Sequence, residues 1–448
     1  MRGEAPLWWV WLATWPVVAV FVLSNAATPL YLLWQRDLGF SRGTLTVVFA
    51  CYIVGLLSSL LVCGVASDRW GRKPVLLPAL GLAFVGCVLF ATAGSVAALV
   101  AGRLLTGIAV GAAVSAGMAA VTDVAGPGRK RLGALLASCA MVFGAGLGPL
   151  LAGIVSETLP GPTVTVFLLE MVLLASAAGT VWRMPLHHPS AGAVPPGAAT
   201  GTTASATTGT AASPASPASP ATNAAAGTAV GAAQGAAKGA AASARAGSWV
   251  RVPRVPRGRG RQLGLGIAVF APGLTATSFV LSLGPSLLAD LLDSDSRVLA
   301  GAMAFVMFLA STAVQFGVQR LSRRTILAAG AAGTLLGMGS LVAAVHTSAV
   351  PVLVAAALLA GAGQGMGQLG GLSLLNASVP PERLAEANAA LNVGGYAPAG
   401  LLAVSVGFLG DGFGLTTAVT LFATALAACA VAAATIVLTS DRSAMELA

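Results

Sequence analysis

Charged residues are scarce in this chain. Only 24 Lys and Arg and 14 Asp and Glu occur among 448 residues, or 8% of the sequence, whereas a soluble globular protein carries about 25%. Because 56% of the residues are hydrophobic, a soluble fold would leave its surface largely apolar and is excluded. The apolar stretches are continuous rather than alternating, which excludes a membrane β-barrel. We predict an all-α polytopic membrane protein.

Residues suited to metal, disulfide or nucleotide chemistry are also few. The five cysteines stand one by one inside apolar stretches, and two of the three histidines are the adjacent pair His187-His188. Neither a disulfide framework nor a metal site is indicated. No Gly-rich loop followed by Lys-Ser or Lys-Thr is present, which argues against ATP-driven transport. We therefore predict no cofactor, no metal and no enzymatic activity.

Charges, prolines and turn residues divide the apolar sequence into twelve predicted membrane spans. Each is close to or above the roughly 20 apolar residues that cross a bilayer. Six lie on each side of a central segment, so we predict two pseudo-symmetric six-helix halves, residues 1–182 and 263–448. The spans are expected at residues 8–34, 45–66, 75–93, 97–121, 133–155, 163–182, 263–289, 298–319, 325–345, 350–376, 386–409 and 415–439.

The central segment, residues 183–262, differs sharply in composition from the two halves. From His187 to Ser248 it is almost entirely Ala, Gly, Thr, Ser and Pro, which cannot bury enough apolar surface to fold. It ends in an arginine-rich run from Arg251 to Arg261, and each basic residue near anionic headgroups contributes roughly 1 kcal/mol to membrane binding. We interpret the segment as a disordered linker whose basic end binds lipid; regulation and RNA binding are the alternatives.

The distribution of basic residues predicts the orientation. If residue 1 is cytoplasmic, 20 of the 24 Lys and Arg residues lie in cytoplasmic segments, as the positive-inside rule requires. Both termini and the linker are then cytoplasmic, and the protein lies in the cell membrane. The net charge of +10 therefore reflects orientation, and we predict no nucleic-acid partner.

The loop between the second and third spans, residues 64–74, reads GVASDRWGRKP. Gly64 permits close helix approach and Gly71 a tight bend. Asp68 stands among three cations and can pair with a helix end or an arginine, holding one conformational state until protonation or substrate breaks the pair. Asp123, at the inner end of span 4, is expected to join this cluster. Residues with a predicted conformational role are Gly64, Asp68, Arg69, Gly71, Arg72 and Lys73.

This loop resembles the signature of the major facilitator superfamily, a family of membrane transporters. Residues 317–324, GVQRLSRR, resemble a degraded copy without the Asp at the equivalent place in the second half. The order of six spans, long linker and six spans is similar to that family over the whole chain apart from the linker. The resemblance implies a central cavity between the halves and alternating access by rocking.

Two motifs inside spans also resemble the family. Arg103 is the only basic residue deep in a span, where an unpaired arginine costs a few kcal/mol or more. The resemblance implies proton coupling, and hydrogen bonding to helix carbonyls is the structural alternative. Span 5 contains Gly144, Gly148 and Pro149, which resemble the motif of proton–drug exchangers and are given a conformational role. Ala152 departs from that motif, and generic tight packing is the alternative.

Glu170 is the carboxyl expected at mid-depth in span 6. A carboxyl buried there can bind a proton near neutral pH, so we predict proton coupling; facing a cytosolic crevice and pairing with Arg103 are alternatives. Helical spacing also predicts polar side chains in the cavity wall, and interhelical hydrogen bonding is the alternative for each. The substrate-binding candidates are Asn25, Tyr31, Tyr52, Gln315, Gln364, Gln368, Asn388, Asn392 and Tyr396.

We predict a secondary active transporter of small molecules. Proton-coupled efflux of amphipathic compounds is the first hypothesis, and proton-coupled uptake of a sugar or organic acid is the alternative. A non-transporting receptor or scaffold is disfavoured, since no soluble domain is predicted. The expected partners are a small-molecule substrate, protons and membrane lipids, and a monomer would enclose a complete pathway.

Overall fold

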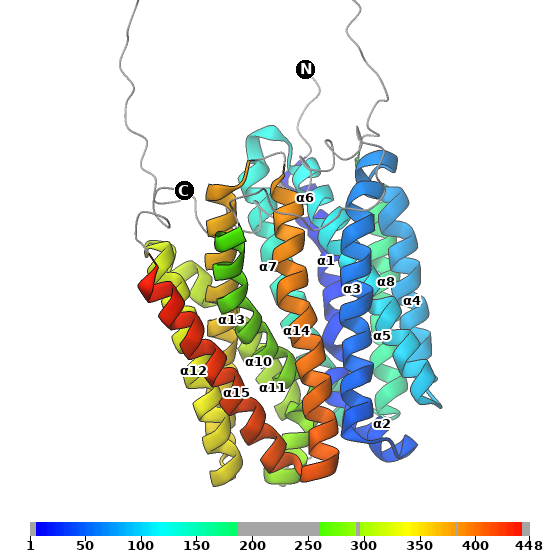
Figure 1. Cartoon of the computed structure of the whole chain (residues 1–448). Helices are drawn as coiled ribbons and strands as arrows, with labels where there is room; N and C mark the ends of the chain where they lie inside the picture. Colours follow the sequence, from blue (N-terminus) through cyan, green and yellow to red (C-terminus); the bar gives the residue numbers. More distant parts are fainter. Residues whose placement is uncertain (1–5, 187–259, 293–295, 381–382, 441–448) are drawn as a thin grey trace, which may run out of the picture.

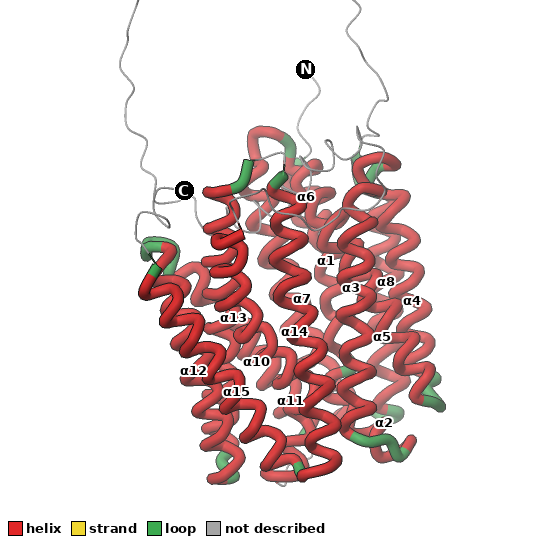
Figure 2. Tube along the Cα trace, in the orientation of Figure 1, coloured by secondary structure: helices red, strands yellow, loops and turns green. Residues whose placement is uncertain are grey.

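The computed structural model describes residues 6–186, 260–292, 296–380 and 383–440, and these residues form helices joined by short loops (Figures 1 and 2). None of the described residues forms a strand. The predicted linker and its arginines lie almost entirely outside the described residues, so its disorder and lipid binding stay predictions.

The helices are α1 Leu7–Ala26, α2 Tyr31–Leu38, α3 Arg42–Trp70, α4 Lys73–Ala91, α5 Val96–Ala112, α6 Met118–Ala125, α7 Lys130–Thr158, α8 Pro162–Arg183, α10 Gly260–Leu292, α11 Arg297–Gly317, α12 Arg323–Thr347, α13 Val350–Ser378, α14 Leu384–Phe413 and α15 Leu415–Thr439.

Twelve helical stretches of the described chain are long and apolar enough to cross a membrane. They confirm the twelve predicted spans, with every end within four residues of its predicted position. The first span is interrupted by a short 3-10 turn, Thr28–Leu30, between α1 and α2. The fourth contains one π-helical turn, Ala113–Gly117, between α5 and α6.

Several helices begin where the sequence supplies a capping serine. The Oγ atoms of Ser41, Ser95, Ser296 and Ser322 each accept a hydrogen bond from the backbone N–H three residues later, at the starts of α3, α5, α11 and α12. Such a cap satisfies one of the N–H groups that a helix start leaves without a partner. The short loops between spans therefore follow from local sequence.

The helices before residue 187, α1–α8, are here called the N-half, and those after residue 259, α10–α15, the C-half. The two halves lie side by side and contact each other mainly through α7 with α11 and α3 with α14 (Figure 1). The end of the bundle at which α8 ends and α10 begins is called the linker end, and the opposite end is called the far end. α1 begins and α15 ends at the linker end (Figure 1).

Candidate transport site

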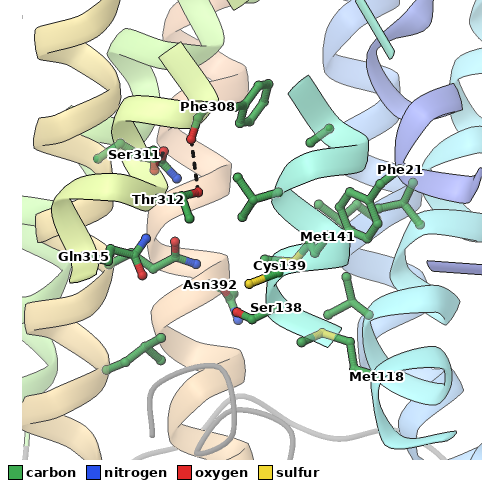
Figure 3. Close-up of a pocket in the computed structure, with 18 of the residues that line it drawn as sticks. Phe21, Met118, Ser138, Cys139, Met141, Phe308, Ser311, Thr312, Gln315 and Asn392 are labelled. Carbon is green, nitrogen blue, oxygen red and sulfur yellow. Dashed lines mark hydrogen bonds between the residues drawn. The ribbon is translucent and has the colours of Figure 1, made fainter. Parts of the chain in front are cut away.

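A cavity of about 200 Å³ lies between the two halves. Its wall contains residues Leu135 to Ala145 of α7 and Phe308 to Phe316 of α11, which lie in the parts of these helices nearest the linker end. Figure 3 shows side chains of the two halves facing each other across this space. The cavity therefore reaches from the middle of the bundle toward the linker end.

The two walls of the cavity differ in chemistry. The N-half contributes mainly apolar side chains, among them Phe21, Met118 and Met141. The four carboxamides among the lining residues all belong to the C-half, where Ser311 also donates a hydrogen bond of 3.0 Å to Oε1 of Gln364. None of the described lining residues carries a formal charge. The carboxamides are those of Gln315, Gln364, Gln368 and Asn392.

The structure places most of the predicted substrate-binding residues in the cavity wall, and their role in binding stays a prediction. Those in the wall are Tyr52, Gln315, Gln364, Gln368, Asn392 and Tyr396. The expected placement in the wall is wrong for Asn25, Tyr31 and Asn388, which are buried elsewhere.

Three of the predicted binding residues, spaced four residues apart, form a stripe along α14, and the first of them does not line the cavity. Asn392 and Tyr396 line the cavity, whereas Asn388 is 5% exposed and neither polar atom of its amide has a partner. A helix with 3.6 residues per turn rotates about 40° over each four-residue step, so residues eight apart point about 80° away from each other. Two members of such a stripe can therefore line a cavity that the third does not reach.

Asn25 donates a hydrogen bond to the backbone of α7. Pro149 lies inside α7, and because proline has no N–H, the carbonyl of Ala145 lacks its usual helical donor. The Nδ2 of Asn25 donates a hydrogen bond of 3.3 Å to this oxygen. The carbonyl that Pro149 frees is thus covered by a neighbouring helix, and α7 continues through the proline.

The predicted glycine face of α7 lies against α1. A Cβ at Gly144 would stand 2.7 Å from the carbonyl oxygen of Val18, and one at Gly148 would stand 2.0 Å from that of Val22. Any larger residue would push the two helices apart. The structure thus gives Gly144 and Gly148 a packing role within the N-half, and their conformational role stays a prediction.

Arg103 donates a hydrogen bond to the backbone of the first span, close to where that span is interrupted. Because α1 ends at Ala26, its last carbonyls have no partner within the helix. Nη1 of Arg103 donates a hydrogen bond of 2.7 Å to the carbonyl of Ser24, while Nε and Nη2 have no partner. The guanidinium is fully buried and lies 5.0 Å from the ring centroid of Tyr31, a distance at which the ring face stabilises the cation.

Glu170 does not pair with Arg103, so that alternative is wrong. The carboxyl is 3% exposed, and its Oε2 has no hydrogen-bond partner. It lies one turn from Phe167, whose ring stacks on that of Phe90, and Phe90 is also one of the rings around Arg103. Phe90 and Phe167 thus form a stacked pair that is near Arg103 and one helical turn from Glu170. Neither of them lines the cavity.

The loop predicted to control conformation forms a charge cluster at the linker end. Arg72 donates to Asp68 at 2.5 Å and to Asp123 at 2.9 Å, and it also bonds to Ser67. Burial alone would lower the pKa of Arg72, but the Asp123 and Asp68 carboxylates outweigh burial and raise it. Gly71, with φ of 95°, supplies the bend that brings Arg72 back over α3.

The loop and its degraded copy make one contact in common. Lys73, the first residue of α4, donates to the carbonyl of Trp182 at the end of α8. Arg324, the second residue of α12, donates to the carbonyl of Leu438 at the end of α15. A cation near a helix C-terminus is favourable because the last carbonyls carry partial negative charge. A hydrogen bond thus joins span 3 to span 6 in the N-half, and an equivalent one joins span 9 to span 12 in the C-half.

At the far end, Glu157 joins the N-half to the C-half. It lies in the last turn of α7, and its Oε1 accepts hydrogen bonds from the N–H groups of Arg297 and Val298 and from Oγ of Ser296. These groups form the start of α11, where unpaired N–H groups attract negative charge. A carboxylate of one half therefore caps a helix of the other.

Asp411 makes the same connection in the opposite direction. It lies near the end of α14, and its two oxygens accept from the N–H groups of Arg42 at 3.0 Å and Gly43 at 2.9 Å, at the start of α3. The Arg42 guanidinium also pairs with Asp290 of α10. Glu157 and Asp411, here called the far-end caps, hold the halves together at the end away from the cavity.

Close backbone contacts accompany the far-end caps. A Cβ at Gly301 of α11 would stand 2.2 Å from the carbonyl oxygen of Pro149, and one at Gly43 of α3 would stand 2.5 Å from the ring of Phe408. The absence of a side chain at these two glycines is what lets α7 meet α11 and α14 meet α3. The far end is therefore closed by packing as well as by hydrogen bonds.

The far-end caps are not among the residues predicted from the sequence, although a signal for them is present there. A carboxylate in the last turn of a helix is unfavourable to that helix, whose C-terminal end is already partly negative. Glu157 and Asp411 both occupy such positions, which indicates that each carboxylate stabilises a helix other than its own. Ser138, Cys139 and Thr312 of the cavity wall were also missed, since single small residues give no periodic pattern.

Comparison with known proteins identifies the family. The sequence profile of the Major Facilitator Superfamily matches residues 10–317, which is more than half of the chain. The chain belongs to the Major Facilitator Superfamily. The fold agrees, because the solved structure of the proton:xylose symporter XylE superposes with a TM-score of 0.55 at 16% identity, covering 96% of this chain and 94% of that one.

Two curated members of the superfamily are similar over short segments. The multidrug resistance protein MdtL of Escherichia coli O45:K1 is 31% identical over 109 residues, which cover 23% of this chain and 28% of MdtL. The 3-(3-hydroxy-phenyl)propionate transporter of Escherichia coli K12 is 35% identical over 100 residues, which cover 22% and 25% of the two chains. The chain thus matches these relatives over little more than a quarter of their length.

We expect Arg103→Leu to destabilise the protein and Arg103→Lys to do so less. Leucine leaves the Ser24 carbonyl without a donor in the membrane, which costs about 1–3 kcal/mol, whereas lysine keeps a donor and the charge. The measurement is the midpoint of thermal unfolding of the purified protein in detergent. Equal midpoints for wild type and Arg103→Leu would show that this hydrogen bond contributes nothing to stability.

We expect the double variant Glu157→Gln, Asp411→Asn to open the far end. Each charged cap contributes about 0.5–2 kcal/mol, so losing both charges should populate a state with longer distances there. Spin labels at the exposed Thr92 and Thr347, one in each half, report this distance. Asp37→Asn, which removes an exposed carboxylate at the same end, is the control. Indistinguishable distance distributions in the two variants would contradict a role for the caps in closure.

Proposed function

We propose that this transporter exports small amphipathic molecules from the cytoplasm in exchange for protons. The observation that carries the proposal is the cavity between the halves, which reaches toward the linker end while the far-end caps close the opposite end. Given the predicted orientation, with the linker and both termini in the cytoplasm, this form receives its substrate from the cytoplasm. We further propose that it works as a monomer in the cell membrane.

Three observations favour export with proton exchange. The glycines and Pro149 of α7 resemble the span-5 motif of proton–drug exchangers, and one curated relative is named as a multidrug resistance protein. Glu170 supplies a buried carboxyl without a partner, which is a group that can bind and release a proton during the cycle. Arg103, which does not pair with Glu170, is the second candidate for coupling.

Proton-coupled uptake of a nutrient is the second candidate function. A solved structure with the same fold is a proton:xylose symporter, and another curated relative is named as a transporter of an aromatic acid. The four carboxamides of the C-half wall would also suit the hydroxyl groups of a sugar. Vesicles of opposite orientation separate the two directions.

We expect acidification of the interior of inside-out vesicles to drive accumulation of amphipathic drugs. Glu170→Gln should abolish this gradient-driven accumulation while leaving substrate counterflow, which needs no proton movement, and Glu170→Asp should retain both. The measurement is uptake of a radiolabelled drug panel with and without an ionophore. Entry of substrate together with protons into right-side-out vesicles would establish uptake instead.

We expect Asp68→Asn to lower the rate of transport by about tenfold or more, the effect of about 1.4 kcal/mol on a barrier. The substitution weakens the pairing of Asp68 with Arg72, on which the predicted conformational role of the loop depends. Glu386→Gln, which weakens an exposed pair with Arg383 at the same end, is the matched control. Normal transport by Asp68→Asn in a correctly inserted protein would remove the loop from the mechanism.

A further inference from the structure

The cavity offers two different surfaces to a ligand. On the N-half side, Phe21, Met118 and Met141 present an aromatic ring and two thioethers, which adapt to flat apolar shapes. On the C-half side stand the four carboxamides, each of which can donate and accept hydrogen bonds. A ligand that fills the space meets mainly apolar surface on the N-half side. On the C-half side it meets the carboxamides, which lie among apolar residues: Phe308, Phe316, Leu372 and Leu391.

The C-half wall is arranged to bind polar groups of a ligand. Ser311 donates to Oε1 of Gln364 and thereby orients this amide, while Thr312 bonds to the carbonyl of Phe308 within its own helix (Figure 3). Gln315 on α11 and Asn392 on α14 also belong to the C-half wall. The donors and acceptors that remain on these amides are available to a ligand.

The described wall contains no charge that would pair with a charged ligand. A ligand that carries a full charge loses its hydration free energy on entering such a cavity. Hydrogen bonds to carboxamides compensate for only part of that loss. A neutral ligand with hydrogen-bonding groups loses less and finds partners of matching chemistry. The balance therefore favours uncharged molecules over both cations and anions of the same shape.

We propose that the substrates are uncharged aromatic molecules with hydrogen-bonding substituents, which bind with the ring against the N-half and the polar groups on the C-half carboxamides. This inference rests on the proposed function, because it names the substrate class of the same site. It also gives the ligand contacts in both halves, so a bound substrate is sensitive to their relative position.

Cys139 provides a native probe of occupancy. Its side chain is exposed and lines the cavity (Figure 3), whereas Cys87 is buried and Cys51 and Cys63 are partly buried. The other exposed cysteine, Cys429, lies on α15 outside the wall. In a Cys429→Ser background, the labelling of Cys139 by a fluorescent maleimide reports whether a ligand fills the cavity.

The experiment compares three probes that share one ring system: 2-naphthylacetamide, 2-naphthylacetate and (2-naphthylmethyl)trimethylammonium. We expect the amide to slow labelling at a concentration at least tenfold lower than either ion. This comparison needs no cavity variant. Equal or better protection by either ion would overturn the proposed substrate class, even if proton-driven export has been demonstrated for other drugs.

Substitutions then test the orientation of the ligand. Gln364→Leu and Asn392→Leu should each raise the concentration of the amide needed for protection by about tenfold, the effect of losing a hydrogen bond of about average strength. Asn388→Ala, on the same helix but outside the wall, should leave it unchanged. Unchanged protection in both cavity variants would overturn the assigned contacts.

Protection by the amide without its transport in energised vesicles would contradict the proposed function but not the binding site.

Discussion

A backbone carbonyl that has no helical donor must find another one, because the interior of a bilayer offers no water. At two places in the N-half where α-helical hydrogen bonding is incomplete, a buried side chain supplies the missing donor. Where α1 ends inside the first span, Arg103 donates to the Ser24 carbonyl, and where Pro149 interrupts the bonding of α7, Asn25 donates to the Ala145 carbonyl. Two buried polar residues that resemble functional groups thus hold the helices α1, α5 and α7 in place.

The contacts at the two ends of the bundle repeat with the pseudo-symmetry of the halves. At the linker end, a cation at the start of span 3 or span 9 bonds to the end of span 6 or span 12 within its own half. At the far end, a carboxylate at the end of span 5 or span 11 caps the start of span 8 or span 2 of the other half. The first kind of contact stabilises each half as a unit, while the second joins the units. Rocking of rigid halves, the movement that the family resemblance implies, would require this division.

The twelve spans could be predicted from sequence because hydropathy, charge and loop length act locally along the chain. The cavity wall was predicted only in part, since helical spacing gives relative angles and no absolute direction, as the burial of Asn388 shows. The far-end caps join residues about 140 and 370 positions apart, and no local pattern pairs them. The absence of a pair between Glu170 and Arg103 is likewise a property of tertiary packing.

The buried charges and the cavity occupy different places, which restricts how protonation can influence the substrate. Neither Arg103 nor Glu170 lines the cavity, so direct competition between proton and substrate at these groups is excluded in this conformation. Tyr52 is the connection, because it lines the cavity and its ring centroid lies 5.9 Å from the Arg103 guanidinium. Tyr52 belongs to α3, a helix that also contacts the C-half through α14. If Arg103 or Glu170 takes part in proton coupling, as we propose, its effect on the substrate has to pass through the position of helices rather than through direct contact.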